Sequence, residues 1–76
     1  MSQQATEEIV IYTHPECEFS AAAKAEFQEL GIPFKEIDIS KVPGAAEELE
    51  RLTGGERITP VIVEGGRVTI GYKGMG

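Results

Sequence analysis

Several residue types that would point to common classes of protein are absent or scarce in this chain of 76 residues. It has no tryptophan, one cysteine and one histidine. A single cysteine cannot form a disulfide within the chain, so nothing calls for an oxidising compartment. No apolar run is long enough to span a membrane, and residues 1–8 lack the apolar core of a signal peptide. We therefore expect a cytoplasmic protein with no membrane partner.

Basic residues are also few, at 7 against 13 acidic ones, which gives a formal net charge of -6. That balance disfavours nucleic acid and anionic lipid as partners, because phosphate binding needs a basic face. The acidic residues are spread over most of the chain and indicate a solvated surface. The length predicts one small domain over residues 1–76, near the size at which a single core only just suffices, with residues 1–7 as a disordered tail.

Hydrophobic periodicity predicts six elements. Apolar and β-branched runs favour strands, and apolar residues at helical spacing favour helices. The first helix should have Phe19, Ala23, Phe27 and Leu30 on one face, and the second an apolar stripe of Ala46, Leu49 and Leu52 or Thr53. The glycine pair at 65–66 is typical of a two-residue hairpin turn. The expected strands are 8–12, 33–39, 61–64 and 67–71, and the expected helices run from 17 or 18 to 30 and from about 43 to 53.

The element order is β-α-β-α-β-β, which predicts the α/β class. The first βαβ unit implies two parallel strands joined by a right-handed crossover, and the hairpin implies an antiparallel pair. A mixed four-stranded sheet with the helices packed on it follows.

Cys17 lies where the first strand gives way to the first helix. The N–H groups and the dipole of a helix start favour a thiolate, so this position suits a reactive thiol. Free cysteines are also often small buried apolar residues. The position of Cys17 by itself leaves both interpretations open.

Four stretches in order carry a resemblance to a known family: IYTHPECEFS, LGIPFKEIDI, LTGGERITPVIV and GGRVTIGYKG. Over roughly residues 8–74 the chain resembles the glutaredoxins, which have the thioredoxin-like fold. The resemblance implies that Cys17 is a nucleophile of depressed pKa, and that Pro60 follows a cis bond and faces the sulfur. The chain stops before the C-terminal helix of most glutaredoxins, so we expect a barer sheet and a weak homodimer.

The resembled motif is C-x-x-S, with Ser20 where a dithiol member has its second cysteine. A serine cannot resolve a mixed disulfide, so the resemblance implies a monothiol mechanism on glutathione mixed disulfides. Glutathione would be the co-substrate, and glutathionylated or disulfide-bearing proteins would be partners. Cys17 and Ser20 are the expected catalytic pair, with Ser20 either donating to the thiolate or serving as an ordinary helix residue.

The resemblance also implies which residues contact substrate. His14 stands where the family usually has a lysine near the thiolate, and Thr59 would pair with the ligand through its backbone. The family's acidic residues after the last strand are absent here, and Lys73 takes their place. Arg57 and Lys73 are expected in loops that border the site, where either could meet a ligand carboxylate. The expected substrate-binding set is His14, Phe19, Arg57, Thr59, Pro60, Tyr72 and Lys73.

Two alternatives stay open. C-x-F-S also resembles monothiol glutaredoxins that hold an iron–sulfur cluster between two subunits, with Cys17 as each chain's only metal ligand. Glu18 replaces the glycine of that signature, and no tryptophan-bearing loop is present. The other alternative is a redox-inert thioredoxin-like interaction module in which Cys17 has an ordinary pKa.

Overall fold

The computed structural model describes residues 8–71. Its six elements follow the order expected from the sequence, and the hairpin strands lie where the sequence places them. The elements are β1 (Ile9–Thr13), α1 (Glu18–Glu29), β2 (Lys35–Asp38), α2 (Ala45–Thr53), β3 (Val61–Glu64) and β4 (Arg67–Ile70).

The second helix begins later than predicted. Pro43 was expected in its first turn, but Gly44 precedes Ala45 as the N-cap, with a φ of 81°. That left-handed conformation suits glycine and lies outside the helical region, so the helix cannot include Pro43. Gly54, with φ also 81°, ends the helix as predicted.

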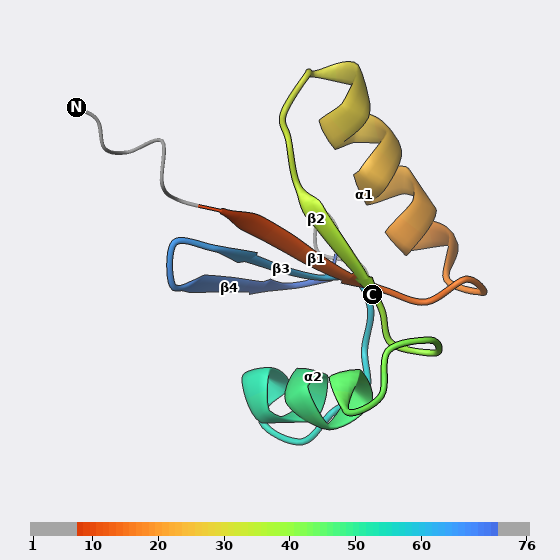
Figure 1. The fold of residues 1–76 in the computed structure, drawn as a ribbon, viewed down its shortest axis with the longest axis vertical. Coiled ribbons are helices and arrows are strands. Elements are labelled where there is room, and N and C mark those ends of the chain that lie inside the picture. The colour runs from red at the N-terminus through yellow and green to blue at the C-terminus, as the bar shows by residue number, and fades with distance from the viewer. Residues whose placement is uncertain (1–7, 72–76) are drawn as a thin grey trace.

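The four strands form one mixed sheet in the order β2-β1-β3-β4. β1 pairs in parallel with β2, while β1–β3 and β3–β4 are antiparallel. Figure 1 shows α1 and α2 on opposite faces of this sheet. β1 is therefore central and covered on both faces, which explains why its sequence is almost continuously apolar.

The larger core lies between the sheet and α2. Tyr12, Leu49 and Val61 form its buried cluster. On the other face, Ile11 of β1 and Ala23 of α1 are both fully buried. Residues 11 and 12 serve opposite faces because side chains alternate along a strand.

One detail of the predicted helix faces was wrong. Leu30 was expected on the apolar face of the first helix but is 63% exposed, because α1 ends at Glu29 and Leu30 is already its C-cap. On α2, the predicted Leu49 is fully buried and Ala46 is half-buried, and Ala45, which was not predicted, is buried as well. Ala45 lies four residues before Leu49 and therefore on the same face of α2.

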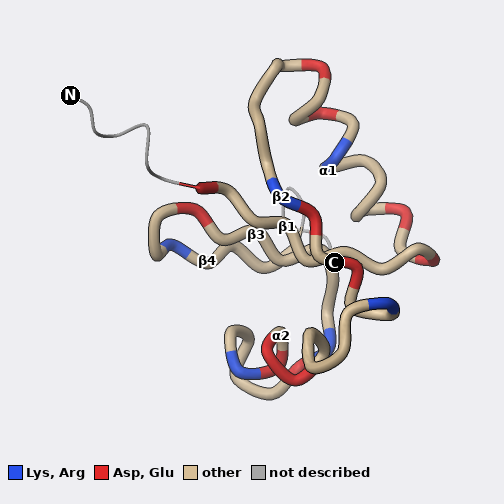
Figure 2. Tube along the Cα trace, viewed as in Figure 1, with Lys and Arg blue, Asp and Glu red and all other residues tan. Residues whose placement is uncertain are grey.

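Charged residues lie on the surface, as the composition predicted. Figure 2 shows acidic residues at the start of α1 and along α2, with lysine and arginine placed among them. Within residues 8–71, no helix combines the length and the apolar character needed to cross a bilayer.

Candidate functional site

Cys17 is the N-cap residue of α1, in extended conformation with φ -97° and ψ 112°. Its own N–H donates to the His14 carbonyl oxygen at 3.0 Å, which closes the turn after β1. The sulfur thus lies at the end of the helix where N–H groups have no intrahelical partner.

A second segment, 42 residues further along, reaches the same sulfur. Cys17 Sγ donates a hydrogen bond to the Thr59 carbonyl oxygen at 3.2 Å. The Thr59–Pro60 peptide bond is cis, as the resemblance implied. Thr59 and Pro60 are buried at the entry to β3, and Gly71 N donates to Pro60 O at 2.7 Å just after β4. The central sheet therefore positions both halves of the contact.

The pKa of the Cys17 thiol lies below its usual value. Burial of the sulfur is the largest influence and raises the pKa. It is outweighed by hydrogen bonds with the Thr59 and Ser20 side chains and with the backbone of Ser20 and Phe19. The last two are N–H groups of the first turn of α1, which favour a thiolate at a helix start. The pKa is low even though the adjacent Glu16 and Glu18 are both exposed acidic residues.

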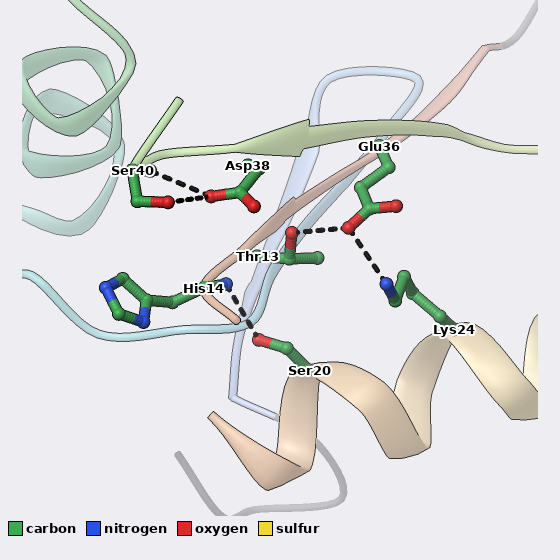
Figure 3. Close-up of polar contacts among 7 residues, drawn as sticks. All are labelled: Thr13, His14, Ser20, Lys24, Glu36, Asp38 and Ser40. Carbon is green, nitrogen blue, oxygen red and sulfur yellow. Dashed lines mark hydrogen bonds and ion pairs between the residues drawn. The ribbon is translucent and has the colours of Figure 1, made fainter. Parts of the chain in front are cut away.

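Ser20 lies within the first turn of α1 and is 1% exposed. Its hydroxyl oxygen accepts a hydrogen bond from the His14 N–H at 3.4 Å (Figure 3). Because the oxygen accepts this bond, its own hydrogen is left to point toward Cys17, whose pKa it lowers. The geometry therefore favours the first of the two roles considered for Ser20, that of a donor to the thiolate.

The His14 ring points away from Ser20, toward the side of Ser40 and Asp38 (Figure 3). Its Nδ1 accepts a hydrogen bond from the Glu16 N–H at 3.1 Å, which places the proton of a neutral ring on Nε2. In the described part of the chain, the ring makes no hydrogen bond with the sulfur. His14 is a wall of the neighbouring pocket, and the loop backbone alone connects it to Cys17.

That pocket has a volume of about 340 Å³ and begins beside the Thr59 contact. Arg57 enters it from the loop before β3, and Arg57 Nε is ion-paired with Glu50 of α2. This pairing raises the pKa of Arg57, so its positive charge is held at the pocket edge. Its lining residues are His14, Ile39, Ser40, Ala46, Arg57 and Thr59.

A second hollow of similar volume, about 340 Å³, continues from the first along the loop before α2. The two share Ile39, Ser40, Ala46 and Arg57, so together they form one groove that leads away from Thr59. No motif in the sequence pointed to Ile39 or Ser40. They become part of the groove because β1 and β2 are parallel, which brings the ends of both strands to the same edge.

The structure shows no direct side-chain contact with the sulfur for three other expected substrate-binding residues. Phe19 is half-buried in the first turn of α1, and its backbone contributes to the low Cys17 pKa. Tyr72 and Lys73 lie outside the described residues. For the described residues, no three histidine, cysteine, aspartate or glutamate side chains gather where they could hold a metal ion. A cluster shared between two chains is a different arrangement, and it stays a prediction.

The middle of α1 is fixed against the sheet by a further set of polar contacts. Glu36 Oε2 of β2 accepts hydrogen bonds from Thr13 Oγ1 at 2.8 Å and from Lys24 Nζ at 2.9 Å (Figure 3). These bonds connect β2, β1 and α1. They lie within one helical turn of Ser20, so they hold the helix that carries the thiol site.

A thiol at a helix start, next to the residue that precedes a cis proline, is the arrangement that the family resemblance implied. The family model described as glutaredoxin matches residues 9–69. The chain therefore belongs to the glutaredoxin family, whose fold and general chemistry are those of thiol–disulfide oxidoreductases. A comparison with curated proteins gave no match.

Solved structures agree on the fold. The glutaredoxin-like NrdH-redoxin of Escherichia coli is similar at 33% identity and a TM-score of 0.76, with 87% of this chain and 84% of that chain covered. The glutaredoxin of Archaeoglobus fulgidus is similar at 24% identity and 0.77, with 92% and 80% covered. A buckwheat glutaredoxin–glutathione complex matches at 22% identity and 0.73, with 87% and 62% covered.

Proposed function

We propose that this chain is a monothiol oxidoreductase that reduces glutathione mixed disulfides, with Cys17 as its nucleophile. The observation that carries the proposal is the position of Cys17 Sγ, 3.2 Å from Thr59 O at the start of α1, with a lowered pKa. A thiol with a low pKa exposes more thiolate at neutral pH, and the thiolate is the attacking form.

The reaction needs two exchanges. First, the Cys17 thiolate attacks the glutathione sulfur of a mixed disulfide R–S–S–G. A bond forms between Cys17 and glutathione, and R leaves as a thiolate that takes a proton from water. A second glutathione thiolate then attacks the bound glutathione sulfur. Oxidised glutathione leaves and the Cys17 thiolate is restored, so one R–S–S–G and one glutathione thiol give R–SH and oxidised glutathione.

Several of the described site residues have a part in this scheme. The Ser20 hydroxyl and the first-turn N–H groups stabilise Cys17 as attacking group and as leaving group. Thr59 backbone groups and Pro60 offer an edge along which an extended peptide can lie. The groove beyond Thr59 holds the Arg57 charge, and a guanidinium with one N–H engaged by Glu50 keeps other donors for a ligand carboxylate.

Glutathione is proposed as the thiol for two reasons. Ser20 cannot resolve a mixed disulfide, so a thiol from outside the chain must complete the cycle. The buckwheat relative is described as a glutathione complex.

The lowered pKa of Cys17 also weighs against the redox-inert module, which required a thiol of ordinary pKa. The cytoplasmic setting and the weak homodimer remain predictions.

The test is turnover of a glutathionylated small thiol with reduced glutathione, followed as formation of oxidised glutathione. Cys17→Ser is the matched inactive variant. The proposal predicts activity in the wild-type chain, none in Cys17→Ser, and a rate that depends on glutathione.

Two results would count against it. Equal rates with and without Cys17 would remove the nucleophile from the scheme. Equal rates when dithiothreitol replaces glutathione at matched thiolate concentration would remove glutathione specificity, while leaving the thiol chemistry intact.

A further inference from the structure

Thr59 contacts the Cys17 sulfur through its backbone, and that contact assigns no role to its buried hydroxyl group. Its carbonyl oxygen accepts the thiol hydrogen at 3.2 Å, and the residue is only 9% exposed. In a threonine, four bonds separate the carbonyl oxygen from the hydroxyl oxygen, so both can reach one neighbouring atom. Among the described residues, the Thr59 hydroxyl has no other hydrogen-bond partner, and a buried hydroxyl without a partner is costly.

We propose that the Thr59 hydroxyl donates a hydrogen bond to the Cys17 thiolate, which makes Thr59 a partner of both protonation states of the reacting sulfur. In the thiol state, the S–H donates to the Thr59 carbonyl. Once the proton leaves, the carbonyl lone pairs face a negative sulfur and that bond is lost. The hydroxyl of the same residue then supplies the donor that the thiolate needs.

The low pKa of Cys17 agrees with this assignment. The contact with the Thr59 side chain is the first of the hydrogen bonds that lower it, ahead of Ser20. A carbonyl acceptor alone would favour the protonated thiol and act in the opposite direction. The thiolate thus lies between two hydroxyls, one from α1 and one from the segment before β3. This deepens the proposed function, on which it rests only in taking Cys17 as the reacting group.

The test compares side chains that differ in the hydroxyl while the backbone stays in place. Thr59→Val replaces the hydroxyl with a methyl group of similar size, and Thr59→Ser keeps it. Thr69→Val, on the exposed strand β4, is the matched control for the same exchange away from the sulfur. The readout is the pH at which Cys17 ionises, from thiolate absorbance near 240 nm with Cys17→Ser as the blank.

The ionisation midpoint should move to higher pH in Thr59→Val and stay in place in Thr59→Ser and Thr69→Val. Alkylation of Cys17 by iodoacetamide at neutral pH should slow by about threefold or more in Thr59→Val, since a hydrogen bond to a charged group is lost. Thermal unfolding of each variant checks that it is folded. If Thr59→Val does not fold, Thr59→Ala against Thr59→Ser gives the same comparison of hydroxyl present and absent.

Two outcomes would overturn the assignment. One is a midpoint in Thr59→Val equal to that of the wild type. The other is an equal shift in Thr59→Ser, which would assign the effect to packing of the methyl group. The titration uses no glutathione, so it separates the two proposals. If the Cys17 midpoint shifts in Thr59→Val but the wild type does not turn over glutathione mixed disulfides, the proposed function is rejected and the role of the Thr59 hydroxyl stands.

Discussion

The hydroxyl oxygen of Ser20 and the backbone N–H of His14 form a hydrogen bond of 3.4 Å across the turn that carries Cys17. This bond links the first turn of α1 to the end of β1, on either side of the thiol. It also directs the Ser20 hydrogen toward the sulfur. Ser20 therefore stabilises the conformation of the loop and also lowers the pKa of Cys17.

Removing this hydroxyl should affect both. In Ser20→Ala, we expect a higher Cys17 pKa, because a donor to the thiolate is lost, and a loss of about 1 kcal/mol in unfolding free energy, because a part-buried N–H loses its acceptor. Alkylation rate against pH and urea denaturation measure the two effects. Ser40→Ala is the control, since Ser40 donates to Asp38 Oδ1 at 2.6 Å and does not contact the sulfur. An unchanged alkylation profile in Ser20→Ala would contradict the donor role.

Replacing the same residue by cysteine should change the reaction class. Ser20 is buried next to the Cys17 thiol, so Ser20→Cys places two sulfurs within one helical turn. We expect the variant to reduce a protein disulfide such as that of insulin with dithiothreitol as electron source, at least about tenfold faster than the wild type, because an internal thiol can resolve the mixed disulfide.

The matched control is the double variant Cys17→Ser with Ser20→Cys, which has one thiol at the wrong position and should be inactive. If Ser20→Cys is no faster than the wild type, the two positions do not form a working dithiol. The monothiol character would then have a cause other than Ser20.

Glu36 should make the stability depend on pH. Hydrogen bonds from Lys24 and Thr13 lower the pKa of its carboxyl group in the folded state. A lowered pKa contributes stability that is present above the unfolded value of about 4.3 and is lost as pH falls through the folded value. The Lys24–Glu36 pair is about one-third exposed, so solvent screening should keep its contribution under about 1 kcal/mol.

The measurement is unfolding free energy from pH 7 to pH 2 in the wild type and in Lys24→Met. The difference between them should be present at neutral pH and should shrink below about pH 4. Lys35→Met, on the same strand β2 as Glu36 but exposed, is the control and should show no such pattern. A difference that does not vary with pH would assign the effect of Lys24 to packing.

Two leucines test how the core is distributed. Leu49 is fully buried and Leu30 is 63% exposed. We expect Leu49→Ala to cost about 2–5 kcal/mol through lost burial and a cavity, and Leu30→Ala less than about 0.5 kcal/mol. In a domain this small, the first change should leave a large unfolded fraction at 25 °C. Urea or thermal unfolding measures both, and equal costs would contradict the position of Leu30 beyond the end of α1.

The sequence by itself determined the order of the elements, the parallel and antiparallel pairs and the Gly65–Gly66 turn. These depend on local periodicity and turn residues, which can be recognised in the sequence alone. It also predicted that Cys17 begins a helix, because a strand pattern ends and a helical one starts within a few residues. The placement of Pro60 opposite the sulfur came from the family resemblance, as did the cis bond.

Tertiary structure decided the rest, because side-chain direction and exposure depend on neighbours far away in the chain. Only the turn geometry turns the His14 ring toward the groove and away from Ser20. Only the parallel pairing of β1 with β2 brings Ile39 and Ser40 to the site. For Thr59, the sequence analysis predicted a backbone contact and no role for the hydroxyl. It acquires a role because the sheet brings a residue 42 positions from Cys17 to the sulfur.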